Sequence, residues 1–171
     1  MMEYSPRKVA ASLLAAISLL LLGSCGNPTE ESGDTTQDTI TIQRANEKLE
    51  EHMQRTREAF PEAAQFETFS HHKESPCEDP GDPGPRGRVF ASLAYQIKNI
   101  PAESIKEQFS QLKEWWEKNG YRVLTEDADT LRVVSPQDEY TLGLRTNPLN
   151  ELFLLGDSPC VWPNGAPQPE D

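Results

Sequence analysis

Histidine, cysteine and carboxylate side chains are the groups of this chain that could bind a metal ion. Two of its three histidines, His71 and His72, lie shortly before Cys77, Glu78 and Asp79. Imidazole and carboxylate groups both bind zinc or copper. The spacing of these residues matches no established metal motif. We therefore expect a solvated loop, with no metal site and no cofactor.

Hydrolytic chemistry would need a nucleophile oriented by a general base. The sequence contains no G-x-S-x-G elbow, no H-E-x-x-H helix and no G-x-x-x-x-G-K-[ST] loop. Its many carboxylates are scattered over predicted helix faces and turns, where solvated charge is the default. Paired acids for glycoside hydrolysis come together only in space, so an envelope hydrolase stays as the least favoured alternative. We expect a protein that is not an enzyme.

The first 24 residues have the pattern of a secretory signal. Arg7 and Lys8 precede an apolar stretch from about Val9 to Leu22, as the n-region and h-region of a signal peptide do. This stretch is too short to span a hydrocarbon core of ~30 Å, which needs ~20 apolar residues. We expect export from the cytoplasm and no retained transmembrane helix.

The apolar stretch ends in Leu22-Gly23-Ser24-Cys25. This ending resembles the lipobox of bacterial lipoproteins, whose peptidase cuts before a cysteine that carries a thioether-linked diacylglyceryl group. The resemblance implies cleavage between Ser24 and Cys25 and a lipid anchor on Cys25. It also implies a location on the extracytoplasmic face of the cell membrane. The alternative is an ordinary signal peptide with a cysteine in its c-region.

The wider resemblance is to the small secreted lipoproteins common in high-GC Gram-positive bacteria. It is specific over residues 1–40, which hold the lipobox and an acidic, Thr-rich tether, and general beyond them. The family implies a location rather than an activity.

Cys77 and Cys160 are the cysteines that remain if Cys25 carries lipid. An even pair in an oxidising compartment predicts a disulfide. The alternative is two free thiols. A Cys77–Cys160 bond would join the Pro/Gly-rich loop 76–88 to the end of the last predicted strand.

Four residues could form a recognition patch, because aromatic residues and arginine are enriched at binding hot spots. Trp162 follows the second cysteine of the predicted disulfide, and Arg86 and Arg88 lie in the loop at its other end. Trp115 lies at the flank of a predicted helix and is expected to be half exposed. The favoured alternative is that Trp162 covers the edge of the core. The candidate patch consists of Trp115, Trp162, Arg86 and Arg88.

The charge and the length limit the class of partner. The chain has 171 residues and a net charge of −12, which opposes binding to nucleic acid, since that is held mainly by Lys and Arg on phosphates. Residues 25–39 are polar and acidic and read as a flexible tether. Residues 40–163 are expected to form one domain and residues 164–171 a disordered tail.

Apolar periodicity predicts the elements of this domain. Helical spacing covers residues 42–60 and 101–119, and alternation or short apolar runs predict strands at 89–98, 121–125, 130–135, 139–145 and 151–156. Short polar connections favour antiparallel hairpins. The apolar run 152–155 indicates a central strand. Residues 62–75 show no pattern that predicts an element.

The predicted fold class is therefore α+β. It is a two-layer sandwich with two helices on one face of a mostly antiparallel sheet of about five strands, in the order α-β-α-β-β-β-β. The expected function is a membrane-anchored, non-enzymatic binding or adaptor domain for a protein or envelope component. The alternative is a carrier of a small ligand or lipid, with a pocket between the helices and the sheet. The sequence does not define the oligomeric state.

Overall fold

The computed structural model describes residues 37–77 and 86–167. Within these ranges a short 3₁₀ turn, Ala102–Ser104, precedes the second of two helices. The helices and strands are α1 (Ile42–Arg57), β1 (Gln65–Pro76), β2 (Val89–Lys98), α2 (Ile105–Lys118), β3 (Arg122–Glu126), β4 (Thr130–Val134), β5 (Thr141–Thr146) and β6 (Leu152–Asp157).

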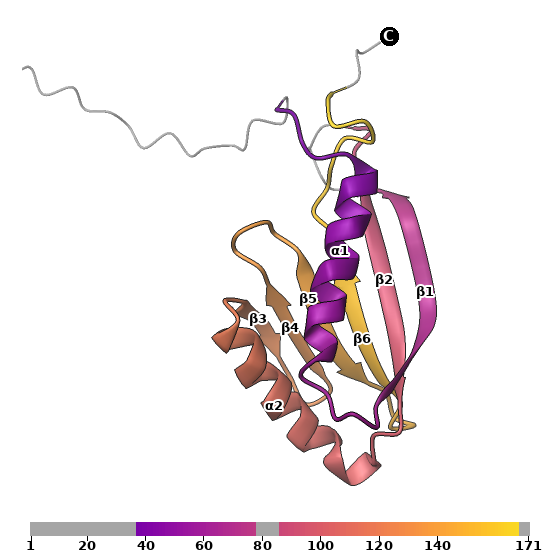
Figure 1. Cartoon of the computed structure of the whole chain (residues 1–171), viewed down its shortest axis with the longest axis vertical. Coiled ribbons are helices and arrows are strands. Elements are labelled where there is room, and N and C mark those ends of the chain that lie inside the picture. The colour runs from indigo at the N-terminus through magenta and orange to yellow at the C-terminus, as the bar shows by residue number, and fades with distance from the viewer. Residues whose placement is uncertain (1–36, 78–85, 168–171) are drawn as a thin grey trace, which may run out of the picture. The chain divides into compact units, whose positions relative to one another are not determined.

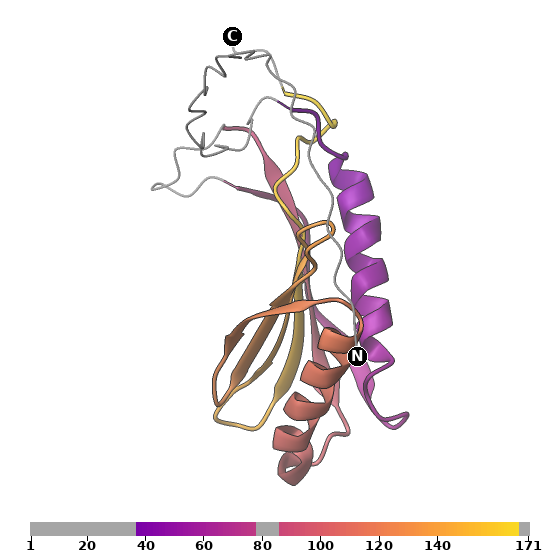
Figure 2. The same cartoon turned by 90° about the vertical axis from the view of Figure 1, so that its left-hand side faces the viewer.

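The strands form a single six-stranded sheet in the order β1-β2-β6-β5-β4-β3, and every neighbouring pair is antiparallel. The connection through α2 starts at β2, next to one edge, and ends at β3, the opposite edge. Both helices lie on the same side of the sheet (Figures 1 and 2). The α+β class and the antiparallel sheet with two helices are thus confirmed.

The sixth strand, β1, corrects the predicted number and order of strands. β1 is an edge strand of mainly polar residues, and its two aromatic residues, Phe66 and Phe69, are three positions apart. The pairing with β2 shifts between Thr68 and Ser70. Phe66 and Phe69 face opposite sides of the sheet, as an odd spacing in a strand requires, and this β-bulge reverses the alternation from Ser70 onwards. A mainly polar strand with an interrupted alternation lacks the period-two pattern that identifies a half-buried strand.

Helix α1 begins at a Thr41 cap, whose side chain accepts a hydrogen bond from the backbone N–H of Arg44 at 3.2 Å. Its buried stripe packs on β2 and β6. Gly156 of β6 lies directly beneath it. A Cβ atom at Gly156 would lie 2.7 Å from Met53 Sδ and 2.9 Å from Leu49 Cδ1, so only glycine allows α1 to approach so closely. The fully buried large side chains are Leu49, Met53, Thr56, Leu112, Trp116, Leu131, Val133, Tyr140, Leu142, Leu144, Leu152 and Leu154.

Strand β6 lies between β2 and β5, as its apolar run predicted. Leu152 and Leu154 are buried on the helix side, whereas Phe153 and Leu155 alternate with them and are half-buried. Both faces of this strand are therefore apolar, but among the described residues only one face is covered by helices. The side of the sheet away from the helices is called the open face below.

Candidate functional site

The open face can be read from the register of the sheet, since residues directly opposite each other point to the same side. Arg132 of β4 pairs with Gly143 of β5, which pairs with Leu155 of β6. Leu155 in turn pairs with Ala94 of β2. This row crosses the middle of the sheet and runs from a charged residue to apolar ones. The open face thus has a charged part over β3 to β5 and an apolar strip that runs from Leu155 and Phe153 of β6 to Ala94 of β2 and Phe69 of β1. Polar residues of β2 and β1, among them Gln96 and Glu67, border this strip.

The apolar strip is centred on two aromatic rings. The ring of Phe69 lies edge-on to that of Phe153, with 5.2 Å between the centroids. Phe69 is 66% exposed, although its ring contacts another ring, and Leu155 is half-buried beside them. Antiparallel sheets can expose one face to water, but that face is then typically polar. Exposed aromatic residues that contact each other are more typical of an interaction surface.

The charged part surrounds a hollow of about 330 Å³. Gly143 has no side chain and therefore leaves room between Arg132 and Leu155. A Cβ atom at Gly143 would lie 3.4 Å from the backbone oxygen of Leu131, with no closer contact. Among the residues that line the hollow are Thr130, Arg132, Thr141, Gly143, Arg145 and Asp157.

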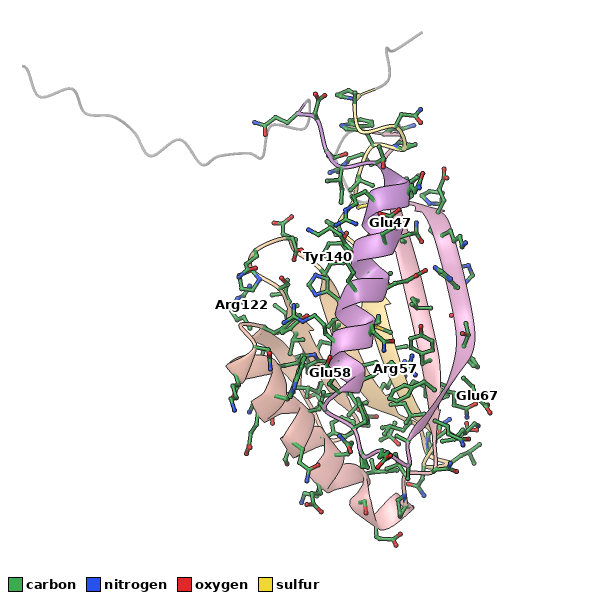
Figure 3. The ribbon with its side chains drawn as sticks, viewed as in Figure 1. Glu47, Arg57, Glu58, Glu67, Arg122 and Tyr140 are labelled. Atoms are coloured by element: carbon green, nitrogen blue, oxygen red, sulfur yellow. A yellow bond between two sulfur atoms is a disulfide. The ribbon has the colours of Figure 1, made fainter. Side chains whose placement is uncertain are left out.

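Three arginines, Arg122, Arg132 and Arg145, belong to this side of the sheet by their register. All three are exposed, and none of their guanidinium groups forms a hydrogen bond or an ion pair with another described residue. Figure 3 shows Arg122 on β3, the strand at the sheet edge. A guanidinium group presents several N–H donors in a planar fork that fits a carboxylate or a phosphate. The open face can therefore bind an anion next to apolar groups, although the whole chain is strongly acidic.

A second polar cluster joins α1 to the connection between β4 and β5. The Asp138 carboxylate accepts hydrogen bonds from Lys48 Nζ at 2.7 Å and from Ser135 Oγ at 2.6 Å. His52 Nε2 lies 3.3 Å from the same carboxylate, and His52 Nδ1 lies 2.6 Å from the hydroxyl of Tyr121. A neutral His52 that donates from Nε2 and accepts at Nδ1 satisfies both contacts.

The hydrogen-bonded series of a carboxylate, an imidazole and a phenol contains the groups found in acid–base sites of enzymes. Unlike those sites, it is poorly accessible. Tyr121 is only 6% exposed, and burial raises the pKa of its hydroxyl. Tyr140 stacks on His52 with 4.7 Å between the ring centroids and is fully buried beside α1 (Figure 3). The phenol of Tyr121 stays neutral near pH 7 and donates to His52 Nδ1 in the tautomer that carries its proton on Nε2. The cluster thus holds α1 against the sheet rather than exposing a reactive group.

Replacing Asp138 by Asn is expected to lower the free energy of unfolding by about 1–2 kcal/mol at pH 7, through weaker hydrogen bonds. Partial burial favours the neutral carboxyl, but hydrogen bonds from Lys48, Ser135 and His52 outweigh it and hold the pKa of Asp138 below its usual value. The stability that this lowered pKa provides is complete above the unfolded pKa of about 4 and is lost as the pH falls through the folded pKa.

Urea unfolding at neutral pH and below pH 3 measures this effect. The difference between wild type and Asp138→Asn should shrink as the pH falls, because a growing fraction of wild-type Asp138 is then protonated. The exposed Asp127→Asn substitution is the control and should change the stability by less than about 0.5 kcal/mol at either pH. An equal loss for Asp138→Asn at both values would show that the carboxylate charge is not what stabilises the cluster.

A cleft of about 550 Å³ lies between α2 and the turn that joins β3 to β4. Ile105, Phe109 and Leu131 provide its apolar lining, and Lys106 and Glu126 are among its charged lining residues. Its volume is within the range of small-molecule sites. The cleft lies between a helix and the sheet, where a carrier would hold its ligand.

The structure confirms the disulfide between Cys77 and Cys160, whose Cα atoms are 6.1 Å apart. Trp162 lies beside it and is 5% exposed. Its indole N–H donates to the backbone oxygen of Gln37 at 3.2 Å, and its backbone N–H donates to Thr39 Oγ1 at 2.8 Å. Trp162 therefore covers a junction between the two ends of the folded chain.

The other members of the candidate patch lie in two places. Arg86 is exposed and Arg88 is half-buried, and both flank Gly87, where a Cβ atom would lie 3.8 Å from the Trp162 ring. Trp115 belongs to α2, is half-buried and packs against the main core. Arg86 and Arg88 thus lie near Trp162, whereas Trp115 lies on helix α2, apart from the other three residues.

The junction between the chain ends also includes residues assigned to the tether and the tail. The backbone N–H of Thr39 donates to the backbone oxygen of Gly165 at 2.8 Å, and that of Ile42 donates to Pro163 at 3.2 Å. Ordered contacts therefore extend to Gln37 on one side and Gly165 on the other.

Several predicted site residues lie outside the described ranges or have other contacts. Ser24, Cys25, Glu78 and Asp79 are outside them. His71 Nε2 lies 3.3 Å from Asn46 Oδ1, on α1. No group of three or more His, Cys, Asp or Glu side chains within residues 37–77 and 86–167 is arranged to hold a metal ion. No helix in the same ranges is long and apolar enough to cross a membrane.

Sequence reasoning missed Phe69 and the three arginines of the open face. A signal for the arginines exists, because Arg132 and Arg145 occupy the positions that alternate with buried residues in two predicted strands. Phe69 has no such signal, since the residues around it in β1 are polar on both faces of the strand and predict no element. Comparisons with protein-family models, with curated proteins and with solved structures found no match to this chain.

Proposed function

We propose that this protein is a non-enzymatic, membrane-anchored binding domain of the extracytoplasmic space, and that the open face is its interface. One observation carries the proposal. Helices α1 and α2 cover one face of the sheet, and the other face combines the exposed Phe69, which contacts the half-buried Phe153, with arginines that have no ionic partner among the described residues. Aromatic residues and arginine are the types enriched at protein interfaces.

Photo-crosslinking from the open face tests this interface. Phe69→p-benzoylphenylalanine, introduced in the native host, is expected to give a discrete crosslinked product. The matched control is the same substitution at Leu149, which is 78% exposed but lies in the turn between β5 and β6, away from the open face. Equal crosslinking at both positions would mean that exposure alone determines capture, and it would contradict the proposed interface.

We place the anchor at Cys25, from the resemblance of Leu22-Gly23-Ser24-Cys25 to a lipobox. Two or more acyl chains hold a protein stably on a membrane, since each buried methylene contributes about 0.8 kcal/mol. Cys25→Ser is expected to release the protein or to leave an unprocessed precursor, as seen by fractionation and intact-mass measurement. Retention of a fully processed Cys25→Ser protein in the membrane fraction would contradict the lipid anchor.

A small-ligand carrier is the second candidate, and the cleft beside α2 favours it. Its apolar lining by Ile105, Phe109 and Leu131 would suit the hydrocarbon part of a ligand, with Lys106 beside a polar or anionic end. Native mass spectrometry of the protein purified from its own host separates the two functions. An added mass that survives gentle desolvation supports the carrier. A bare chain, lighter by two protons for the disulfide, supports the adaptor.

A further inference from the structure

Arg132 and Arg145 are placed to act on one ligand group. Arg145 pairs directly with Thr130, and Thr130 is two residues before Arg132 on the same strand. The two arginines are therefore diagonal neighbours, with backbones about 7–8 Å apart. Both line the hollow over Gly143. Because both side chains are long and lack an ionic partner among the described residues, both can reach an anion seated over Gly143.

The surroundings of this pair limit the kind of anion. Asp157 lines the same hollow, so the two arginines and this carboxylate sum to one positive charge, which suits a single carboxylate better than a polymer with many closely spaced phosphates. The Asp157 carboxylate can accept a hydrogen bond from a peptide N–H or a hydroxyl. Towards β6 and β1 the face becomes apolar, through Leu155, Phe153 and the exposed Phe69. A purely ionic ligand would leave that part of the face unused.

We propose that the open face binds an acidic peptide segment of a partner protein. A Glu or Asp side chain of the segment lies over Gly143 between Arg132 and Arg145, and a neighbouring apolar side chain packs on Phe69 and Phe153. Charge complementarity supports this partner class, since arginine predominates on the charged part of the face in a chain of net charge −12. This proposal rests on the proposed function and adds the chemistry of the partner.

Fluorescence anisotropy with a labelled peptide of Glu, Phe and Ser tests the proposal on the full-length chain in non-ionic detergent. The double variant Arg132→Gln/Arg145→Gln is expected to raise the Kd about tenfold, since each lost charge-assisted hydrogen bond weakens binding severalfold. The control Arg55→Gln/Lys118→Gln removes the same charge from exposed positions of α1 and α2. It should change the Kd less than about twofold.

A second variant separates the hollow from the charge. Gly143→Leu fills the hollow, keeps both arginines and meets no atom closer than 3.4 Å at its Cβ position. It should also raise the Kd about tenfold. Equal unfolding temperatures of the variants and the wild type verify the fold. The same peptide with Gln in place of every Glu should bind at least about tenfold more weakly. It also serves as the control for peptide that partitions into the detergent micelles without binding the protein.

Four results would overturn the proposal. The first two are equal binding of the Glu and Gln peptides and equal effects of the two double variants on the Kd. The third is arginine-dependent binding of polyphosphate or of phosphatidylglycerol vesicles without binding of the peptide. The fourth is a dimer, detected by sedimentation, that Arg132→Gln/Arg145→Gln dissociates. If crosslinking from position 69 persists while the Glu peptide fails, the interface stands and only the acidic partner class is wrong. Loss of site-specific crosslinking overturns the interface itself.

Discussion

Replacing both Cys77 and Cys160 by Ser is expected to lower the free energy of unfolding by about 4–5 kcal/mol. The two cysteines are 83 residues apart in sequence, so the bond closes a long loop in the unfolded chain and removes much of its conformational entropy. Cys77 directly follows β1, and Cys160 lies just beyond β6. The bond therefore ties an edge strand to the segment that follows a central strand.

Guanidinium unfolding of the oxidised protein and of the double Ser variant measures the loss. The native state should stay folded without the bond, because Val161 still pairs with Val89 through two backbone hydrogen bonds of 2.8 and 2.9 Å. Wild type in excess reductant is the control and should match the double variant. A loss below about 1 kcal/mol would mean that the unfolded chain is already restricted at this loop, so that the bond adds little.

Trp162→Ala is expected to lower the free energy of unfolding by about 3–5 kcal/mol, as is typical for truncating a buried large aromatic residue. The indole is buried against Gly87, and its N–H donates to Gln37. Its removal therefore leaves a cavity and loosens the segment before α1. Urea unfolding measures the change, and Trp115→Ala, a truncation of a half-buried tryptophan, should cost less.

The same variant distinguishes the two interpretations of Trp162. If Trp162 covers the core edge, Trp162→Ala lowers stability but leaves crosslinking from position 69 unchanged. If instead the variant keeps its stability and loses the crosslink, then Trp162, with Arg86 and Arg88, belongs to the recognition surface. In that case the open face would not be the whole interface.

Local patterns were sufficient for most elements of this fold. Helices α1 and α2 follow apolar spacings of three and four residues, and the odd-numbered positions of strand β2 from Val89 to Ile97 are all apolar. Each of these elements buries one regular stripe, so its apolar period can be recognised from the sequence of that element alone. The same reasoning identified β6 as central, because both of its faces are apolar.

Edge strand β1 shows where local patterns were insufficient. Its outer edge pairs with no described strand, and a bulge after Thr68 reverses the alternation of its mainly polar residues. A polar sequence without alternation is compatible with a loop as well as with a strand. Pairing with β2 decides between them, and it depends on residues far along the chain.

The candidate interface also depends on strand pairing, which the local sequence does not reveal. Arg132 and Arg145 alternate with buried residues, so the sequence alone places them away from the core. That they flank one hollow depends on the pairing of Thr130 with Arg145 and of Arg132 with Gly143. The polar cluster around Asp138 likewise joins Lys48 and His52 to a turn that lies 90 and 86 residues further along the chain.

The sequence by itself thus determined the α+β class, both helices, five of the six strands and the pairing of Cys77 with Cys160. Each of these follows from a local apolar period or from the even number of cysteines that remain if Cys25 carries lipid. Only the tertiary structure decided the sixth strand, the open face, the hollow over Gly143 and the burial of Trp162. These depend on contacts between distant residues, and such contacts leave no period in the sequence because their geometry is set by the register of the sheet.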